Sequence, residues 1–128
     1  MEIENQEYDV FVQTFEDTPF LVFTVYASYR VMDGKYVDAV LFMNYLNSRF
    51  QYPGSISVDE DGYIRYKRHM ELDGLDPSLV IIKSMIESAY SLFNSHQEAI
   101  AAVALTSRTY ESLKEECSHK WDSEENND

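Results

Sequence analysis

The chain has little cysteine and no long apolar run. Its 128 residues include a single cysteine, Cys117, so no intramolecular disulfide can form. A lone thiol is typical of a reducing compartment, and we expect a cytoplasmic protein. Residues 1–10 lack the basic and apolar segments of a signal peptide. No apolar run approaches the roughly 18 residues that a membrane span needs.

Cations are also scarce. Lys and Arg total 10 against 23 Asp and Glu, which gives a formal net charge of −13. Nucleic-acid binding requires a basic surface that displaces counterions from phosphate. A strongly negative field instead repels phosphate and anionic lipid. We therefore expect neither a nucleic-acid partner nor a membrane partner.

Motifs for catalysis and metal binding are missing as well. No serine has a Gly-x-Ser-x-Gly context, and the 4 glycines form no phosphate-binding loop. The histidines, His69, His96 and His119, show no metal-ligand spacing. Cys117 lies beside Glu116, and nearby carboxylates raise the pKa of a thiol rather than lower it. The sequence predicts no enzyme, no cofactor and no metal site.

An acidic turn gives one calcium-like pattern. Asp59, Asp61 and Gly62 resemble part of a calcium loop, but Arg68 falls where that loop requires a bidentate Glu. The flanking segments are predicted strands rather than helices. A simple hairpin turn is the better interpretation, with Gly62 free to adopt a positive φ.

Aromatic residues, by contrast, are abundant, and their spacing predicts the fold. They make up 14% of the chain, with 10 Tyr and 7 Phe, which is typical of a packed core. Alternating apolar residues predict strands over 8–15, 20–32, 55–59 and 63–72. Helical spacing predicts a helix over 36–50 and a long one from the Asp76-Pro77 start onward. This β-β-α-β-β-α order predicts an α+β fold: an antiparallel sheet with a long C-terminal helix packed on it.

A single domain is expected over residues 8–110. Residues 1–7 are polar and are expected to be frayed. Residues 111–128 form an acidic tail, of which at least residues 122–128 are expected to be disordered.

Several local patterns resemble a known family. The 36–50 helix closes on Leu46-Asn47, and the Asp59-Glu60-Asp61-Gly62 turn leads to a strand that ends on Leu72-Asp73-Gly74-Leu75, just before the Asp76-Pro77-Ser78 helix start. Over roughly residues 8–105 the chain resembles the YbjN-like family of bacterial sensory transduction regulators. Their fold is similar to that of type III secretion chaperones. The resemblance implies a protein-binding or regulatory module, often dimeric, without established catalytic residues.

The 63–72 strand is locally basic. Alternation places Tyr63, Arg65 and Lys67 on one face, together with His69, whereas Arg68 falls on the other face. Such cations can blunt an exposed sheet edge or pair with the many acids of the chain. Alternatively, they form a basic and aromatic strip that binds an acidic segment, either a partner's or the chain's own tail.

The 36–50 helix has more apolar surface than packing against one sheet requires. Phe42, Met43, Tyr45 and Leu46 widen its apolar side. These side chains can belong to the core, or they can form an interface, where aromatic residues and Met are enriched.

These observations predict a non-enzymatic protein-binding or adaptor module that docks a partner segment on its sheet or helix surface, and a homodimer. The expected partner-binding residues are Tyr63, Arg65, Lys67, Arg68, Phe42, Met43 and Tyr45. The alternative is a small-ligand sensor with an aromatic-lined pocket between the sheet and the helices.

Overall fold

The computed structural model describes residues 1–3, 5–15, 17–72 and 78–126. The elements are β1 (Glu2–Ile3), β2 (Gln6–Phe15), β3 (Thr18–Arg30), α1 (Tyr36–Arg49), β4 (Ser55–Val58), β5 (Tyr63–Glu71), α2 (Leu79–Leu105) and α3 (Tyr110–Asn126). The α+β fold predicted from the sequence is confirmed. The structure adds two elements that the sequence did not predict, the short strand β1 and the separate helix α3.

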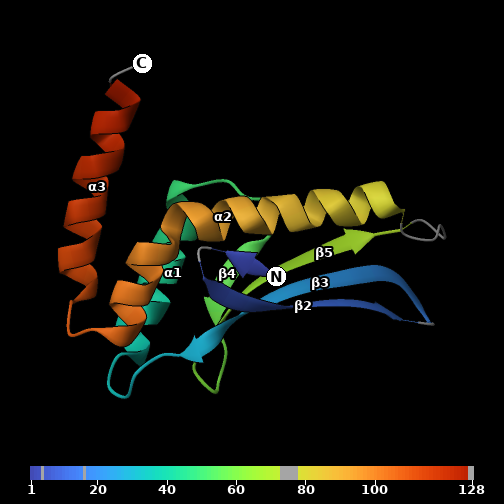
Figure 1. Cartoon of the computed structure of the whole chain (residues 1–128), viewed down its shortest axis with the longest axis horizontal. Coiled ribbons are helices and arrows are strands. Elements are labelled where there is room, and N and C mark those ends of the chain that lie inside the picture. Colours follow the sequence, from blue (N-terminus) through green and yellow to red (C-terminus); the bar gives the residue numbers. More distant parts are fainter. Residues whose placement is uncertain (4, 16, 73–77, 127–128) are drawn as a thin grey trace.

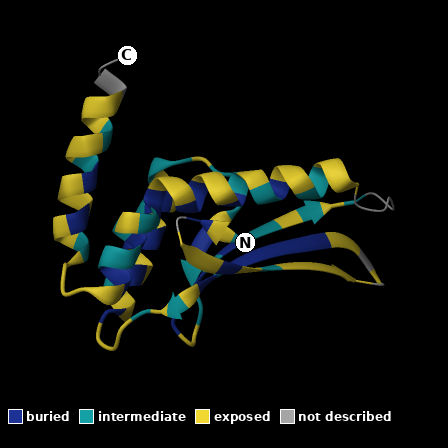
Figure 2. Ribbon diagram, viewed as in Figure 1, coloured by how far each residue is buried: buried dark blue, intermediate teal, exposed yellow. Residues whose placement is uncertain are grey.

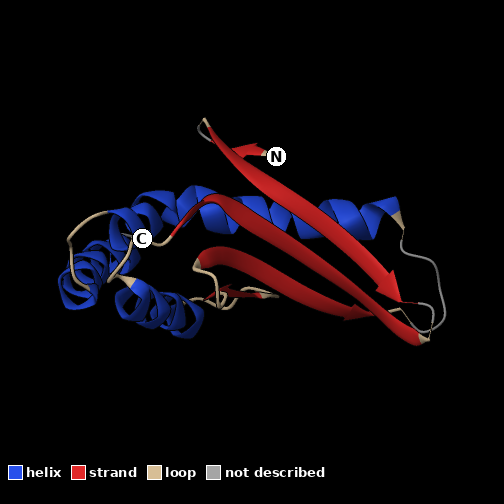
Figure 3. Ribbon diagram, turned by 90° about the horizontal axis from the view of Figure 1, so that it is seen from below, coloured by secondary structure: helices blue, strands red, loops and turns tan. Residues whose placement is uncertain are grey.

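The strands form one antiparallel sheet in the order β1-β2-β3-β5-β4. The long helix α2 lies along one face of this sheet, while α1 and α3 lie at one end of it (Figures 1 and 3). β3 is the centre of the sheet, because its β-branched and aromatic residues pair with β2 on one side and with β5 on the other.

The core fills the layer between the sheet and α2. On β3 the side chains of Leu21, Phe23 and Val25 are fully buried, as the alternation predicts. Met85 and Phe93 on α2 are fully buried as well. Burying each large apolar side chain stabilises the fold by about 1.5–3 kcal/mol, so this layer holds the sheet and the helix together.

Turn residues behave as the sequence predicts. Gly62 has a φ of 87° in the hairpin between β4 and β5. There Asp59 Oδ1 accepts hydrogen bonds from the backbone N–H groups of Asp61 and Tyr63, at 3.0 and 2.8 Å. The predicted Asp76-Pro77 helix start lies outside the described residues. The N-cap of α2 is Ser78, whose hydroxyl accepts from the Ile81 N–H at 3.2 Å.

The expectation of frayed residues 1–7 is corrected. Ile3 is buried in the core, and β1 pairs with the start of β2. The Met1 amino group donates to the Tyr8 carbonyl at 2.9 Å, and the Tyr8 N–H donates to the Met1 carbonyl at 2.7 Å. Two backbone contacts and one buried side chain order a segment that is otherwise polar.

The expectation that residues 122–128 are disordered is corrected for residues 122–126, since Tyr110–Asn126 forms α3; residues 127 and 128 lie outside the described residues. Leu113 and Cys117 on α3 are buried, and Trp121 packs against Phe50 with ring centroids 4.8 Å apart. Arg49 on α1 forms an ion pair with Asp122 at 2.7 Å. An acidic segment therefore folds as a helix because its few apolar side chains all face the rest of the chain.

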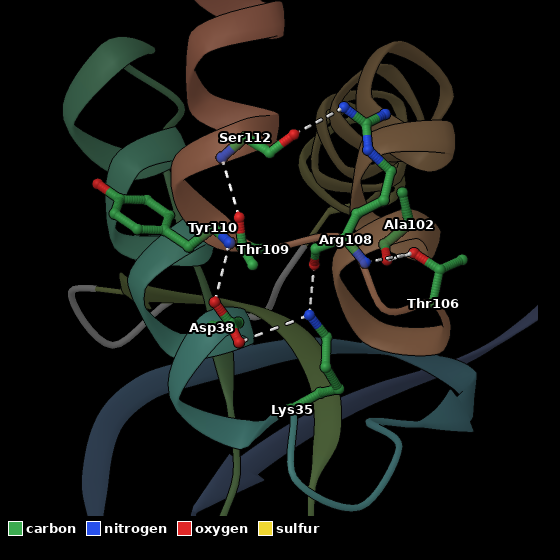
Figure 4. A network of polar contacts seen from close by, with 8 residues as sticks. All are labelled: Lys35, Asp38, Ala102, Thr106, Arg108, Thr109, Tyr110 and Ser112. Carbon is green, nitrogen blue, oxygen red and sulfur yellow. Dashed lines mark hydrogen bonds and ion pairs between the residues drawn. The ribbon is translucent and has the colours of Figure 1, made fainter.

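A polar network fixes the junction between α1 and α3 (Figure 4). The Lys35 side chain donates to the Arg108 carbonyl and lies 3.5 Å from Asp38, although Lys35 is only 7% exposed. Asp38 in turn accepts from the N–H of Tyr110, at the start of α3, at 2.8 Å. Thr109 caps the same helix start by accepting from the Ser112 N–H at 3.2 Å.

None of the helices formed by the described residues has the length and apolar character needed to cross a bilayer.

Replacing Lys35 with Met should lower the free energy of unfolding by about 1–3 kcal/mol, because the Arg108 carbonyl and Asp38 lose the buried lysine that donates to both. Urea denaturation measures the effect. Lys83→Met, which removes an exposed lysine of α2, is the matched control and should change stability by less than about 0.5 kcal/mol. Equal stability of the two variants would show that the network does not hold the junction.

Candidate binding surface

The sheet has one face that no described element covers. Side chains of β3 alternate, so Leu21, Phe23 and Val25 point toward α2 and the residues between them point away. Seen from below, the strands lie in front of α2 with no helix over them (Figure 3). We call this uncovered side the open face. Its central residues are Phe11 and Gln13 of β2, Phe20, Val22, Thr24 and Tyr26 of β3, and Tyr63, Arg65, Lys67 and His69 of β5.

Aromatic side chains are exposed on the open face. Phe11 is 50% exposed and Phe20 43% exposed. Phe11 packs edge-on against Tyr26, with ring centroids 5.9 Å apart. Exposed rings of this kind supply large apolar contact area for a partner.

Two shallow hollows lie side by side on the open face. One, of about 390 Å³, is lined by Gln13, Phe15, Phe20, Val22, Lys67 and His69. The other, of about 230 Å³, is lined by Phe11, Gln13, Thr24, Tyr26, Arg65 and Lys67. Gln13 and Lys67 belong to both hollows, so they form the ridge between them.

The cations of β5 divide between the two faces, as the alternation predicts. Arg65 and Lys67 pair with Tyr26 and Thr24 and lie on the open face, next to Tyr63. Arg68 pairs with buried Phe23 and lies on the helix side. Within the described part of the chain, neither Arg65 nor Lys67 forms an ion pair; Arg65 Nε donates to Ser57 Oγ at 3.4 Å.

The position of β5 weakens the two alternative explanations of these cations. Over residues 64–67, β5 lies between β3 and β4, so Arg65 and Lys67 do not blunt a sheet edge. They also lack carboxylate partners in the described chain, although acids outnumber bases 23 to 10. The third explanation is a binding surface, in which the half-buried cations Arg65 and Lys67 lie beside exposed aromatic rings.

The three residues of α1 predicted to bind a partner, Phe42, Met43 and Tyr45, are directed inward. Phe42 and Met43 are fully buried in the core. The Tyr45 hydroxyl hydrogen-bonds Ser118 Oγ at 2.6 Å, and its ring stacks on Trp121 at 6.0 Å. These three side chains are therefore covered by other parts of the same chain and do not join the open face, whereas Val37, Val40 and Leu41 of α1 are exposed.

Sequence reasoning did not select Phe11, Gln13, Phe20 or Tyr26 as site residues. The signal was present, since alternation puts Phe11 and Phe15 on one side of β2 and Phe20, Val22 and Tyr26 on one side of β3. Which of the two sides carries the helix depends on packing between distant segments.

A second cluster surrounds His96 on α2, which is 4% exposed. Its Nε2 lies 3.1 Å from the Tyr52 hydroxyl, and the rings of Phe50 and Trp121 lie 4.6 and 5.4 Å from the imidazole. Burial, helped by the positive charge of Lys120, lowers the pKa of His96 to about 4. The imidazole is therefore neutral near pH 7, and the cluster is a packing contact between α2 and α3.

The structure offers little for nucleophilic or metal chemistry. Burial raises the pKa of the Cys117 thiol, and Glu116 adds to this, which disfavours the thiolate. The described residues contain no group of three or more His, Cys, Asp or Glu side chains that could hold a metal ion. Asp59, from the calcium-like pattern, uses one carboxylate oxygen to accept two backbone hydrogen bonds within its own turn.

The pKa of His96 predicts a pH-dependent stability. The unfolded chain takes up a proton near pH 6.5, whereas the folded chain does so only near pH 4. The stability contributed by neutral His96 is present above pH 6.5 and is lost as the pH falls toward 4, by on the order of 2–3 kcal/mol. Unfolding followed by the fluorescence of Trp121, the only tryptophan, should show this loss in the native sequence and a smaller loss in His96→Gln. His119→Gln, at an exposed histidine, should lose stability with falling pH as the native chain does. The same loss in His96→Gln would show that His96 is not its source.

No protein-family model matches this chain, and no curated protein matches it. Its function must therefore be inferred from the chemistry of its own surface, above all from the open face.

Proposed function

We propose that the chain is a non-enzymatic protein-binding module that holds an extended segment of a partner protein on the open face. The observation that carries this proposal is the pair of half-buried cations, Arg65 and Lys67, which have no carboxylate partner among the described residues and are flanked by exposed aromatic rings. A face of this composition can bind a ligand that has both carboxylates, which pair with the cations, and apolar side chains, which pack on the aromatic rings.

The partner segment is mildly acidic rather than strongly acidic. Carboxylates opposite Arg65 and Lys67 form charge-assisted hydrogen bonds, which are about twice as strong as neutral ones. The net charge of −13 repels a segment with many acids at long range. One or two carboxylates between apolar residues fit both conditions.

Apolar side chains of the partner supply most of the affinity. The two hollows, of about 390 and 230 Å³, each offer an aromatic wall beside a cation. Anchoring side chains typically contribute about 2 kcal/mol or more when they fill such sites. Lys67, on the ridge between the hollows, places the charged contact between two apolar ones.

The small-ligand alternative has less support. It requires a pocket between the sheet and the helices, where Phe23 and Phe93 are fully buried and Tyr8 packs on Phe93 at 4.6 Å between ring centroids. The hollows on the open face are shallow, which suits a peptide better than an enclosed small molecule.

A photo-crosslinking residue at Gln13 tests where a partner binds, because Gln13 lies on the ridge of the open face. We expect it to capture a protein in cells that a crosslinker at Ser91, an exposed position on α2, does not capture. Capture from Ser91 but not from Gln13 would place binding elsewhere and contradict the proposal.

The captured protein then allows a quantitative test with purified components. Replacing Arg65 and Lys67 together with Glu should weaken binding at least tenfold, or about 1.4 kcal/mol, because like charges replace attraction. Lys83→Glu with Lys114→Glu makes the same charge change on α2 and α3, outside the open face, and should leave the affinity within about twofold. Equal effects of the two pairs, measured by fluorescence anisotropy, would show that only net charge matters.

A further inference from the structure

The two edge strands of the sheet, β4 and β2, differ in whether their outward backbone groups have hydrogen-bond partners. At one edge, β4 is covered by the side chain of Asn47 from α1. Asn47 Nδ2 donates to the Ile56 carbonyl at 2.8 Å, and the Ile56 N–H donates to Asn47 Oδ1 at 3.0 Å. A single amide thus takes the place of a neighbouring strand at Ile56, the middle of a short edge strand.

At the other edge, β2 has such a neighbour only at its beginning. Both backbone groups of Tyr8 point away from β3 and bond to Met1. Because backbone groups alternate along a strand, those of Val10, Val12 and Thr14 also point outward, while Phe11 and Gln13 bond to β3. β1 ends at Ile3, and no described residue bonds to the outward groups of Val10, Val12 or Thr14.

The free part of this edge has the composition of a paired strand. Residues 10–15 read Val-Phe-Val-Gln-Thr-Phe, with no charge, no proline and no glycine, in a chain that is 26% charged. Val12 lies on the helix side of the sheet, opposite buried Phe23, yet it is 43% exposed. Figure 2 shows β2 as mostly exposed beside the buried stretch of β3. Lysine, proline or a covering element normally protects such an edge, and none is present among the described residues.

We propose that a second copy of this chain pairs with this edge, β2 against β2, antiparallel across a two-fold axis at Val12. This register sets Val10 opposite Thr14 of the partner subunit and Val12 opposite Val12 of the partner subunit. All three outward residues of each copy then exchange backbone hydrogen bonds, about six in total. A register centred one residue earlier places Thr14 against Tyr8, whose backbone groups are already bonded to Met1.

Symmetry and charge favour a second copy over a foreign strand. Antiparallel pairing of one segment with itself uses the same surface on both copies, so the assembly closes as a dimer and does not extend into a fibre. The uncharged stretch meets an uncharged stretch, which avoids burying a charge without a partner. The two Val12 side chains, now exposed, contact each other on the helix side of the joined sheet.

The dimer carries both open faces on one continuous sheet and leaves them uncovered, so this inference does not depend on the proposed function. Each copy carries a net charge of −13, and Asp9 and Asp17 lie near the two ends of the pairing segment. The two copies therefore repel each other at long range, and the dimer should become tighter as salt is added.

Sedimentation equilibrium of the full chain tests the dimer. We expect a reversible dimer at about 50 µM that dissociates on dilution, with a dissociation constant that falls as salt is raised. Val12→Pro removes one outward N–H per copy without touching the β2–β3 hydrogen bonds, and should weaken the dimer at least about tenfold. Val12→Thr, which keeps the N–H and the β-branched shape, should remain dimeric within about threefold. Circular dichroism shows whether each variant is folded.

A crosslink tests the register even if Val12→Pro does not fold. Val12→Cys places two cysteines across the axis, with Cα atoms about 5.5 Å apart, which a disulfide can bridge. Mild oxidation should give a covalent dimer, whereas Ser91→Cys, on the exposed side of α2, should not. A monomeric native chain at about 100 µM in high salt overturns the proposal, as does a dimer whose affinity Val12→Pro leaves unchanged or one that Val12→Cys fails to crosslink.

Discussion

The packing of α2 along one face of the sheet is the constraint on which the rest of the structure depends. A helix of 27 residues is about 40 Å long and about 10 Å across, and neighbouring strands lie about 4.8 Å apart. One such helix therefore covers roughly two strands along their length. Residues of β3 beneath it, such as Phe23 and Val25, are fully buried, whereas Val12 on the next strand is not.

This one-sided cover explains the open face. An antiparallel sheet with one covered face usually turns polar residues to water on the other side. Here that side combines exposed Phe11 and Phe20 with Arg65 and Lys67, which lack ion-pair partners in the described chain. Exposed apolar area on this scale lowers the solubility of a protein unless a partner covers it. The high negative charge elsewhere on the molecule favours solubility and offsets this effect.

The helix α3 carries part of the acidic surface away from this face. That helix lies at the end of the molecule, beyond α1, and its anchors are few: Leu113, Cys117 and Trp121 (Figure 1). Lys35 and Asp38 fix its start, and Arg49 holds its later turns through Asp122. The charge asymmetry of the sequence thus becomes a spatial separation between an acidic helix and a cationic strip on the sheet.

Much of the fold follows from local patterns that the sequence displays directly. Alternation along β3 and β5, the Gly62 turn and the helical spacing of α1 and α2 all arise from neighbouring residues, and the structure agrees with them. β1 and α3 were missed for a common reason. A two-residue strand shows no alternation, and the acidic α3 has too few apolar residues to show a clear apolar stripe. Ile3 and Trp121 pack against distant segments, which the local sequence does not reveal.

The candidate binding surface was likewise predictable from the sequence in part only. Alternation along β5 is enough to place Tyr63, Arg65 and Lys67 on one face and Arg68 on the other, because alternation is a property of the strand alone. The strand order, the cover of the other face by α2 and the free edge of β2 follow instead from tertiary packing. Strand order and helix placement depend on which buried surfaces meet, and those surfaces come from residues far apart in the chain.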